Sequence, residues 1–586
     1  MPNVDLGGII NNSAILSVHK PGRYVGREPN IIIKEGLVDF TIALAFPDVY
    51  EVGMSHVGLK ILYHLLNTLP GVQAERVFVP WPDMGKLMRQ RGIPLYSLER
   101  KLPVVSFDLL GISLQHELNY TNVLYLLDLA GIPFYSEERG DNFPLIVGGG
   151  PCAFNPEPLA PFFDFFFIGE AEEGFPEIVR VLREVKGEPK ENILRLLSHL
   201  EGVYVPAFRK PVKKRWVQNL DAVLYPSTMV VPYVSIIHDR IPIEISRGCT
   251  RGCRFCQAGI IYRPRRERSP QKIVELAQSL VDTTGYEEVS LVSLSSTDYS
   301  SIDSLLRALS LLFGPRKVNI SLPSLRMDAF SVEIAKELQK VRKSGLTFAP
   351  EAGNERLRAV INKHLKDEEI LSTVEKAFTS GWEDLKLYFM IGLPEERDTD
   401  VGDIARLVAE ILRVGKACRG KKVDIHLSIA AFIPKPHTPF QWVAQERREC
   451  LNEKMKLLTS RLRTLGKSVR FHWSCFEMSA IEALLARGDA RLAKVIERVY
   501  RRDGFMEGWS EFFDGRRWEE ALQEEGLSLD EYVYKPGSFE EPFPWDWIDC
   551  GVRKELLWRE YEKARRGEFT PSCWNGFECS QCGVCS

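Results

Sequence analysis

Three closely spaced cysteines near the middle of the chain form the pattern best suited to chemistry. Cys249, Cys253 and Cys256 lie in the stretch SRGCTRGCRFCQAG, with C-x-x-x-C-x-x-C spacing. Thiolates are soft ligands that suit iron–sulfur clusters and zinc. Because a closed metal site needs four ligands, this loop leaves one metal position open for a reactant. A structural zinc loop is the alternative, although zinc sites usually show paired C-x-x-C units.

Glycines and arginines alternate with these thiols. Gly248 and Gly252 let the backbone wrap closely around a metal centre. We expect Arg247, Arg251 and Arg254 to lower the pKa of the thiols and to offset the negative charge of a cluster.

A second group of cysteines lies at the end of the sequence, in PSCWNGFECSQCGVCS. Four soft ligands close a metal site without outside help. The tail therefore predicts a second 4Fe-4S cluster or a structural zinc, and the spacing alone does not choose between them. The four predicted ligands are Cys573, Cys579, Cys582 and Cys585.

Strand and helix patterns alternate through the first two hundred residues. Five runs are typical of buried strands: VDFTIALAFP, AERVFVPW, DLLGISLQ, PLIVGGG and FFDFFFIG. Helical patterns such as VGLKILYHLLNTL and NYTNVLYLLDLAG lie between them. This alternation predicts an α/β fold with a parallel, doubly wound sheet. Such sheets bind ligands beyond the carboxyl ends of their strands, where Ser113 and the glycines Gly148, Gly149 and Gly150 would lie.

A second α/β unit is predicted after a proline-rich stretch. Six strand-like runs alternate with helices there, which predicts a partial (β/α)6 barrel with the three cysteines after its first strand. A mostly helical region follows, and we expect it to pack against the barrel and to end in the cysteine tail. The predicted segments are a sheet domain at 1–205, a linker at 206–235, the barrel at 236–475 and the C-terminal region at 476–586.

Composition sets further limits on location and partners. The net charge of the 586-residue chain is −3, so a nucleic acid would have to meet a local basic patch. We expect a cytoplasmic protein, because there is no N-terminal leader and no apolar run long enough for a membrane span. One basic loop could hold phosphates, or it could be a set of solvated or paired arginines. It contains Arg263, Arg265, Arg266 and Arg268.

The cysteine spacing, with the aromatic Phe255 before the last thiol, resembles the radical SAM superfamily. In that family, the open iron of a 4Fe-4S cluster binds the amino and carboxylate groups of S-adenosylmethionine (SAM). Reductive cleavage of SAM then releases a 5′-deoxyadenosyl radical. The resemblance implies a catalytic role for the three cysteines and an electron donor such as a flavodoxin or ferredoxin.

Other strand ends match positions that contact SAM in this superfamily. Arginine is expected near the SAM carboxylate because its fork of donors binds a carboxylate through two hydrogen bonds. The turn of Gly392, Leu393 and Pro394 resembles the one beside the adenine. The other SAM-binding positions that the resemblance implies are Ser295, Ser296, Thr297, Ser324, Arg326, Glu351 and Arg356.

The upstream domain resembles the cobalamin-binding domain that precedes many radical SAM domains. The segments GGGPCAFNPEPL and FIGEAEEGFPE carry this match, and Gly169 and Glu170 fit the G-E-x-E pattern. The resemblance implies that cobalamin binds at the glycine-rich strand ends. The D-x-H-x-x-G motif of an axial histidine is missing, so His56 is expected either to cap a helix or, less securely, to reach cobalt.

Three functions remain open from the sequence. The first is methylation of an unactivated carbon or phosphorus atom, with cobalamin as the methyl carrier. The second is a sulfur-inserting or other radical modification of RNA or a ribosomal component that uses the tail cluster. The third is a cluster-bearing module that binds RNA. The sequence does not name the substrate.

Overall fold

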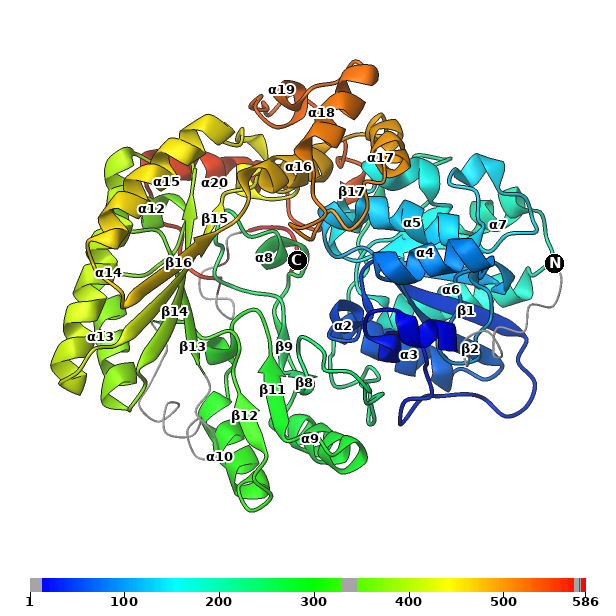
Figure 1. Ribbon diagram of the computed structural model, residues 1–586, viewed down its shortest axis with the longest axis horizontal. Coiled ribbons are helices and arrows are strands. Elements are labelled where there is room, and N and C mark those ends of the chain that lie inside the picture. The colour runs from blue at the N-terminus through cyan, green and yellow to red at the C-terminus, as the bar shows by residue number, and fades with distance from the viewer. Residues whose placement is uncertain (1–12, 328–344, 574–578, 580, 586) are drawn as a thin grey trace.

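The computed structural model describes residues 13–327, 345–573, 579 and 581–585. Two α/β units lie side by side in Figure 1, with the N-terminal unit in blue and cyan and the second in green and yellow. Helices near the C-terminus lie across the top of both units in this view. Among the described residues, no helix combines the length and hydrophobicity needed to cross a membrane.

The N-terminal unit is built on a six-stranded sheet of order β2-β1-β3-β4-β5-β6. Strands β1 to β5 are parallel, and β6 runs antiparallel to β5. This order reverses direction between β1 and β3, where doubly wound sheets bind their ligands. The strands are β1 (Phe40–Phe46), β2 (Val72–Phe78), β3 (Leu109–Ser113), β4 (Leu145–Gly149), β5 (Phe165–Phe167) and β6 (Val203–Tyr204).

Helices cover both faces of this sheet and bury its apolar side chains in two separate clusters. One cluster joins the sheet to α3 and α6, and the other joins it to α4 and α5. The predicted doubly wound sheet is therefore confirmed. The helices are α2 (Tyr50–Gly53), α3 (Val57–Thr68), α4 (Pro82–Arg91), α5 (Tyr120–Ala130), α6 (Ala171–Glu184) and α7 (Lys190–Leu197).

The second unit contains two parallel sheets, of order β12-β11-β8 and β13-β14-β15-β16. The sequence predicts six strands here, and the structure contains a seventh, β16. It was not predicted because VRFHW is a largely exposed edge strand without a clear apolar alternation. The strands are β8 (Ile241–Glu244), β11 (Glu288–Val292), β12 (Asn319–Ser321), β13 (Leu346–Glu351), β14 (Asp384–Ile391), β15 (Asp424–Ala431) and β16 (Val469–Trp473).

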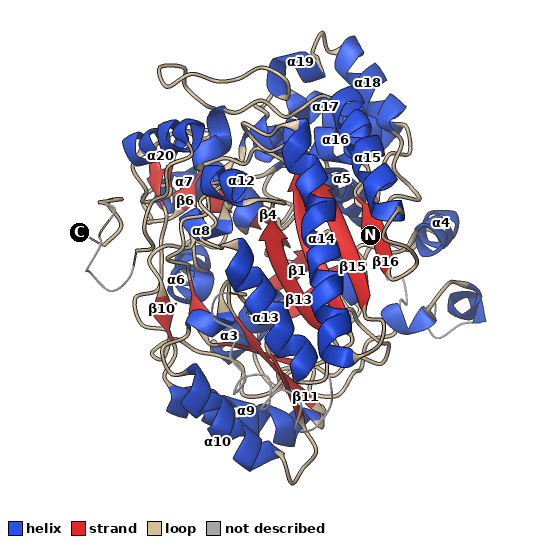
Figure 2. Cartoon of the chain, turned by 90° about the vertical axis from the view of Figure 1, so that its left-hand side faces the viewer, coloured by secondary structure: helices blue, strands red, loops and turns tan. Residues whose placement is uncertain are grey.

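Helices lie on the outer side of these two sheets and share one core with them. Figure 2, which looks from that side, shows α13 and α14 in front of the strands. The opposite face of the four-stranded sheet turns toward the middle of the molecule. The helices are α9 (Pro270–Thr284), α10 (Ile302–Phe313), α13 (Asp367–Thr379), α14 (Asp398–Arg419) and α15 (Arg448–Arg463). The short α12 (Glu355–Val360) packs in a separate small cluster.

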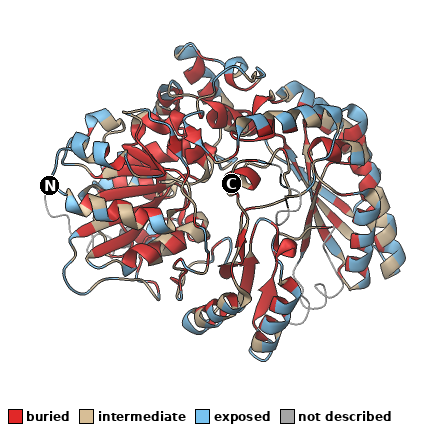
Figure 3. Ribbon diagram, turned by 180° about the vertical axis from the view of Figure 1, so that it is seen from behind, coloured by how far each residue is buried: buried red, intermediate tan, exposed pale blue. Residues whose placement is uncertain are grey.

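The C-terminal helices join the two units. We expected them to pack against the barrel, and α20 does contact α12, but α16, α17 and α18 also share the core of the N-terminal sheet. Tyr125 of α5 stacks on Phe505 with 4.3 Å between ring centroids. Figure 3 shows this junction as largely buried. The elements are α16 (Phe476–Arg487), α17 (Leu492–Arg501), α18 (Gly515–Glu524), α19 (Leu529–Tyr532), β17 (Ile548–Asp549) and α20 (Lys554–Arg566).

The predicted linker is ordered by pairing with the far end of the chain. Its strand β7 (Val212–Lys213) runs parallel to β17. Lys214 is buried, and its ammonium donates to the backbone carbonyls of Ile261 and Arg263 at 2.8 and 2.6 Å. The linker therefore contacts the segment that follows the three barrel cysteines.

Candidate functional site

The cysteine loop begins directly after β8, at the carboxyl end of the first barrel strand. Its start forms β9 (Ser246–Arg247), which pairs with β10 (Arg266–Glu267), and its end leads into α8 (Ala258–Ile261). Gly248 has φ +84°, and a Cβ there would lie 2.5 Å from the Pro264 carbonyl oxygen. Only glycine fits this close return of the chain.

The three thiols of this loop lie close to one another. Burial raises the pKa of Cys249, and the neighbouring Cys253 thiol raises it further. Burial, followed by the other two thiols, raises the pKa of Cys256 to about 12. A metal that binds here must displace these protons, and the spacing leaves one cluster iron for a further ligand.

We expected Arg247, Arg251 and Arg254 to lower the pKa of these thiols, but the pKa of Cys249 and that of Cys256 are raised. Arg251 pairs with Asp298, and Arg254 is fully buried against Glu560 and the backbone carbonyls of Ala359 and Val360. Because each guanidinium already faces a carboxylate, its charge offers little to the thiols. These partners are distant in sequence, so the local spacing could not reveal them.

The predicted SAM positions at the ends of β11 and β12 are joined to one another. The backbone N–H of Ser296 donates to the Ser324 carbonyl at 3.1 Å, and the N–H of Arg326 donates to the Thr297 hydroxyl at 3.4 Å. The Ser295 hydroxyl donates to Asp298 at 2.6 Å. The charge of Arg326 reaches Cys249 and opposes the rise of that pKa. These strand ends therefore meet beside the cysteine loop.

The fourth barrel strand also contributes to this region. Glu351 is half-buried at the end of β13, and Lys363 lies 3.4 Å from its carboxylate. Burial raises the pKa of Glu351, and Lys363 opposes that rise. The Lys363 charge also reaches Cys256. Lys363 was missed from the sequence, because it follows α12 rather than a strand end.

Three other predicted SAM positions have structural partners. The Arg356 guanidinium donates to Asp400 and to the Glu395 carbonyl, near the start of α14. Gly392 has φ +74°, so its backbone conformation favours glycine whatever ligand lies nearby. Phe255 packs in a small apolar cluster beside the barrel. Contact of these residues with SAM stays a prediction.

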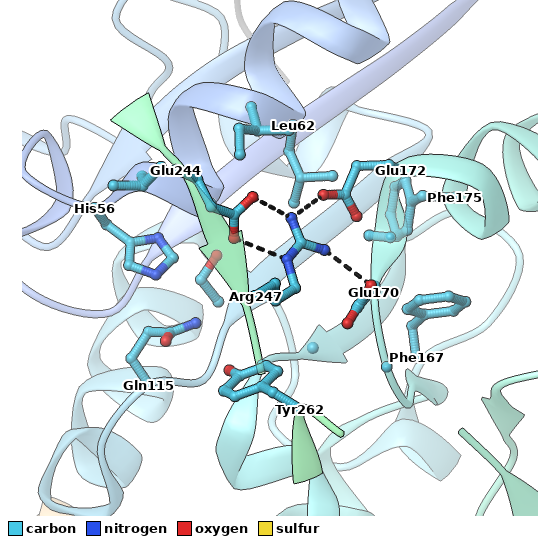
Figure 4. A pocket seen from close by; sticks show the side chains of 18 of the residues that line it. His56, Leu62, Gln115, Phe167, Glu170, Glu172, Phe175, Glu244, Arg247 and Tyr262 are labelled. Carbon is cyan, nitrogen blue, oxygen red and sulfur yellow. Dashed lines mark hydrogen bonds and ion pairs between the residues drawn. The ribbon is translucent and has the colours of Figure 1, made fainter. Parts of the chain in front are cut away.

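A cavity of about 350 Å³ lies between the N-terminal sheet and the barrel. Its wall contains strand ends of both units, including Gly111 and Ser113 on one side and Gly248 and Ser293 on the other. Figure 4 shows the side chains that point into it. The predicted cofactor positions Ser113, Gly148, Gly149, Gly150, Gly169 and Glu170 all line this cavity.

The glycines of this wall are required for different reasons. A Cβ at Gly148 would lie 2.7 Å from Phe166, and at Gly169 it would lie 1.9 Å from the Arg215 carbonyl oxygen, so packing requires both glycines. A Cβ at Gly149 would meet only the Phe167 carbonyl oxygen, at 3.7 Å. A methyl group would therefore fit the protein at Gly149 but would reduce the space beside this strand end.

Ion pairs hold the two walls of the cavity together. Arg247 lies between Glu244 of its own unit and Glu170 and Glu172 of the N-terminal unit, as Figure 4 shows. Burial raises the pKa of Glu170, but Arg266 and Arg247 outweigh burial and hold it below its usual range. In this structure Glu170 therefore links the two units, and cofactor contact by it stays a prediction.

The basic loop after the cysteines is turned inward. Arg266 pairs with Glu170, Arg265 with Glu267, and Arg268 donates to the Leu220 carbonyl. Arg263, Arg266 and Arg268 are buried. The paired-arginine interpretation fits these contacts, and the loop presents no open row of cations for phosphates.

His56 lies in the cavity wall and caps α3. Its Nδ1 accepts a hydrogen bond from the backbone N–H of Leu59 at 3.1 Å. Burial lowers the pKa of His56 to about 4, so the ring is neutral near pH 7. A neutral imidazole whose Nδ1 accepts carries its proton on Nε2, and Nε2 then has no lone pair for a metal. Of the two roles that the sequence allows, the structure shows the helix cap.

The tail cysteines lie against the barrel loop. The backbone N–H of Cys573 donates to the Thr250 carbonyl at 2.8 Å, which places the tail beside the first three thiols. The pKa of Cys585 is raised by burial and then by the thiols of Cys582, Cys573 and Cys579, so the four thiols are neighbours. Cys579 and Cys585 are exposed, whereas Cys582 is buried.

The two metals that suit four thiols differ in geometry. Tetrahedral zinc would hold its sulfurs about 3.8 Å apart, whereas the ligands of a 4Fe-4S cluster stand farther apart. Whether the tail binds a cluster or zinc stays a prediction.

Comparison with known protein families agrees with this architecture. Residues 243–408 match the model described as "Radical SAM superfamily", and residues 58–206 match the one described as "Radical SAM proteins, N-terminal". The chain therefore contains a radical SAM domain, preceded by the N-terminal region that occurs in radical SAM proteins. The radical SAM fold implies a 4Fe-4S cluster and SAM.

Individual relatives cover different parts of the chain. An uncharacterised protein of Methanocaldococcus jannaschii, MJ0966, is 29% identical over 459 residues, which are 78% of this chain and 90% of that protein. The ribosomal protein uS12 methylthiotransferase RimO of Thermotoga sp. strain RQ2 is 28% identical over 182 residues, which are 29% of this chain and 41% of that enzyme.

One solved structure resembles nearly the whole fold. The radical SAM methyltransferase TsrM of Kitasatospora setae, solved with cobalamin and a 4Fe-4S cluster, superposes with a TM-score of 0.52 at 12% identity. The match covers 83% of this chain and 99% of that one. At this identity, the likeness shows the fold alone.

Proposed function

We propose that this protein is a cobalamin-dependent radical SAM enzyme that methylates an unactivated atom of its substrate. The observation that carries the proposal is the shared cavity, whose wall joins the ligand-binding edge of the N-terminal sheet to the start of the cysteine loop. A cofactor bound there touches both units at once. The fold of TsrM, which was solved with cobalamin, supports the same assignment.

The lining residues fit a large, mostly apolar cofactor. Gly149 and Gly111 leave space that the packing of the protein does not need, because a Cβ at either position would make only ordinary contacts. Phe167 and Tyr262 present ring surfaces to the cavity in Figure 4. A mostly apolar wall favours a large ring system, and such a ring bound there would exclude water from a radical reaction.

Each part of the chain has a defined task in this proposal. Cys249, Cys253 and Cys256 hold the cluster that cleaves SAM, and the ends of β11 to β13 position SAM. Arg247 and its three carboxylates fix the separation of the two cavity walls. A corrinoid would supply a methyl group able to leave as a radical, which SAM alone does not provide to an unactivated atom.

A test of this reaction measures its products. Protein reduced under anaerobic conditions is given SAM, corrinoid and a cell-extract fraction as the source of substrate. We predict that S-adenosylhomocysteine and 5′-deoxyadenosine form in equal amounts, because one SAM supplies the methyl group and a second supplies the radical. The Cys249→Ala variant should form no 5′-deoxyadenosine, whereas Cys450→Ala, which changes an exposed thiol outside both cysteine groups, should match the wild type.

Sulfur insertion is the second candidate function, favoured by the hydrogen bond that places the tail beside the cluster loop. The partial match to a methylthiotransferase points the same way. Formation of 5′-deoxyadenosine without S-adenosylhomocysteine would support sulfur insertion without methylation and contradict the methylase. A methylthio transfer would form both products, and sulfur in the modified substrate would identify it.

A further inference from the structure

The inner face of the four-stranded barrel sheet carries a cluster of polar and basic side chains in strand register. Lys386 on β14 lies opposite His426 on β15, which lies opposite Arg470 on β16. Neighbouring strands are about 4.8 Å apart, so these three side chains form one row across the sheet. Their neighbours Leu385, Ile425 and Val469 point the other way, into the core beneath α13 to α15.

A second row lies one pleat closer to the cysteine loop. Tyr388, Ser428 and His472 are opposite one another in the same register. The Ser428 hydroxyl lies 3.0 Å from Nε2 of His472, and the Tyr388 side chain is exposed. The two rows together present cations and hydroxyl or imidazole groups on one surface, which faces the middle of the molecule.

The basic row has no carboxylate partner within ion-pair distance. Among the described residues, the ion pairs within 4.0 Å include neither the Lys386 ammonium nor the Arg470 guanidinium. Asp384 and Asp424 lie one pleat nearer the strand starts, outside that distance. By contrast, Arg247, Arg251 and Arg254 of the cluster loop each pair with a carboxylate. The Lys386 and Arg470 cations lie in one row, and an anion bound between them would offset their mutual repulsion.

We propose that these two rows bind an anionic group of the substrate, a phosphate or a carboxylate. Its opposite end would then reach the strand ends beside the cluster. Met390, near the end of β14, follows Lys386 by four positions, which is a rise of about 13 Å along the strand. The substrate is therefore an elongated molecule whose anionic group lies roughly that far from the atom that reacts.

This inference deepens the proposed function, because it assigns a substrate class to the same barrel. Lys386 and Arg470 supply the charge, and Arg470 adds a planar fork of donors that suits either anion. Tyr388 and His472 add hydrogen-bonding side chains from the second row. The geometry does not separate a phosphate from a carboxylate, so the experiment tests each.

The test measures anion binding directly, without turnover. Anaerobic protein with its cluster and SAM is titrated with inorganic phosphate, followed by ³¹P NMR line width, and separately with succinate, followed by saturation-transfer NMR. The Lys386→Ala/Arg470→Ala variant should bind the preferred anion roughly tenfold more weakly or worse, because it loses two charged donors. The preferred anion identifies the substrate group.

A matched control removes the same charge nearby. The Lys456→Ala/Lys467→Ala variant changes two exposed cations on the outer side of the same unit and should bind anions like the wild type. Equal binding by the two double variants, or no binding by the wild type, would overturn the anion site. His472→Ala, with a smaller expected loss, checks the assignment should the first variant be unstable.

The readout separates this inference from the proposed methyl transfer. Dithionite-driven cleavage of SAM and corrinoid binding are measured on the same samples. If the Lys386→Ala/Arg470→Ala variant loses anion binding but keeps SAM cleavage and corrinoid binding, the result supports the anion site. Wild-type anion binding in a protein that binds no corrinoid would contradict only the methylase.

Discussion

At the scale of single residues, the cavity wall shows how one side chain can be excluded from metal binding by its own hydrogen bonds. His56 faces the cavity, yet its Nδ1 accepts the backbone N–H of Leu59 and its proton lies on Nε2. The ring therefore acts as a helix cap with a lowered pKa.

His56 should make the stability of the protein sensitive to mild acid. Its pKa is about 4 in the fold, against 6.5 in the unfolded chain, so the unfolded state binds more protons between these values. The contribution of the neutral His56 ring to the free energy of unfolding is fully present above about pH 6.5 and falls as the pH drops toward 4. We predict that His56→Asn, which keeps a good cap acceptor but cannot titrate, loses less stability over this range.

Urea unfolding of both proteins at pH 7.5 and pH 4.5 measures this effect. His64 and His238 also have lowered pKa values, so only the difference between wild type and variant reports on His56. An identical loss of stability in the two proteins would show that His56 does not titrate as the structure implies.

At the scale of elements, the strands and helices that build the two units follow from the sequence. Apolar runs between glycine and proline predict the five parallel strands of the first sheet and six barrel strands. Strand β16 was missed because Arg470 and His472 are exposed and break its apolar pattern. Such an edge strand is fixed by pairing with β15, a long-range contact that local periodicity does not encode.

The site was predictable to the extent that it lies at strand ends. The cysteine loop and the glycine-rich strand end were found this way, and the structure brings both to one cavity. The roles of Arg247 and Glu170 were not found, because their ion pair joins residues 77 positions apart in different units. Packing between units decides such contacts, and residue types alone do not reveal them.

The tail is predicted to bind a metal centre independently of the barrel loop. We predict that a variant with Cys249, Cys253 and Cys256 changed to Ala retains about four iron atoms per chain, because four tail thiols close a site unaided. Anaerobic reconstitution followed by iron and sulfide analysis measures this. A reciprocal variant with Cys579, Cys582 and Cys585 changed to Ala should keep the barrel cluster.

Metal content also distinguishes the two metals that the spacing allows. Zinc in place of iron in the barrel-cysteine variant would keep the tail as a structural element but remove any redox role, because zinc has no redox chemistry. Loss of all bound metal from that variant would contradict an independent tail site.

At the scale of the whole molecule, the two units are locked together around the cavity. The Arg247 cluster ties the start of α6 to the cysteine loop, and α16 to α18 bury a shared core on another side of the junction. Buried ion pairs add little net stability against an apolar alternative, but breaking one costs about 3–5 kcal/mol. The arrangement therefore holds the sheet edge and the cluster loop in a fixed relation, which a cofactor shared between them requires.

Corrinoid binding tests this account most directly. We predict that the anaerobic protein binds about one cobalamin per chain, measured by equilibrium dialysis with visible absorbance. Gly149→Leu should lose this binding, because its side chain enters space that protein packing leaves unused, while its iron content and thermal unfolding stay those of the wild type. A wild-type protein that binds no corrinoid, or a Gly149→Leu variant that binds it equally well, would contradict the assignment of the cavity.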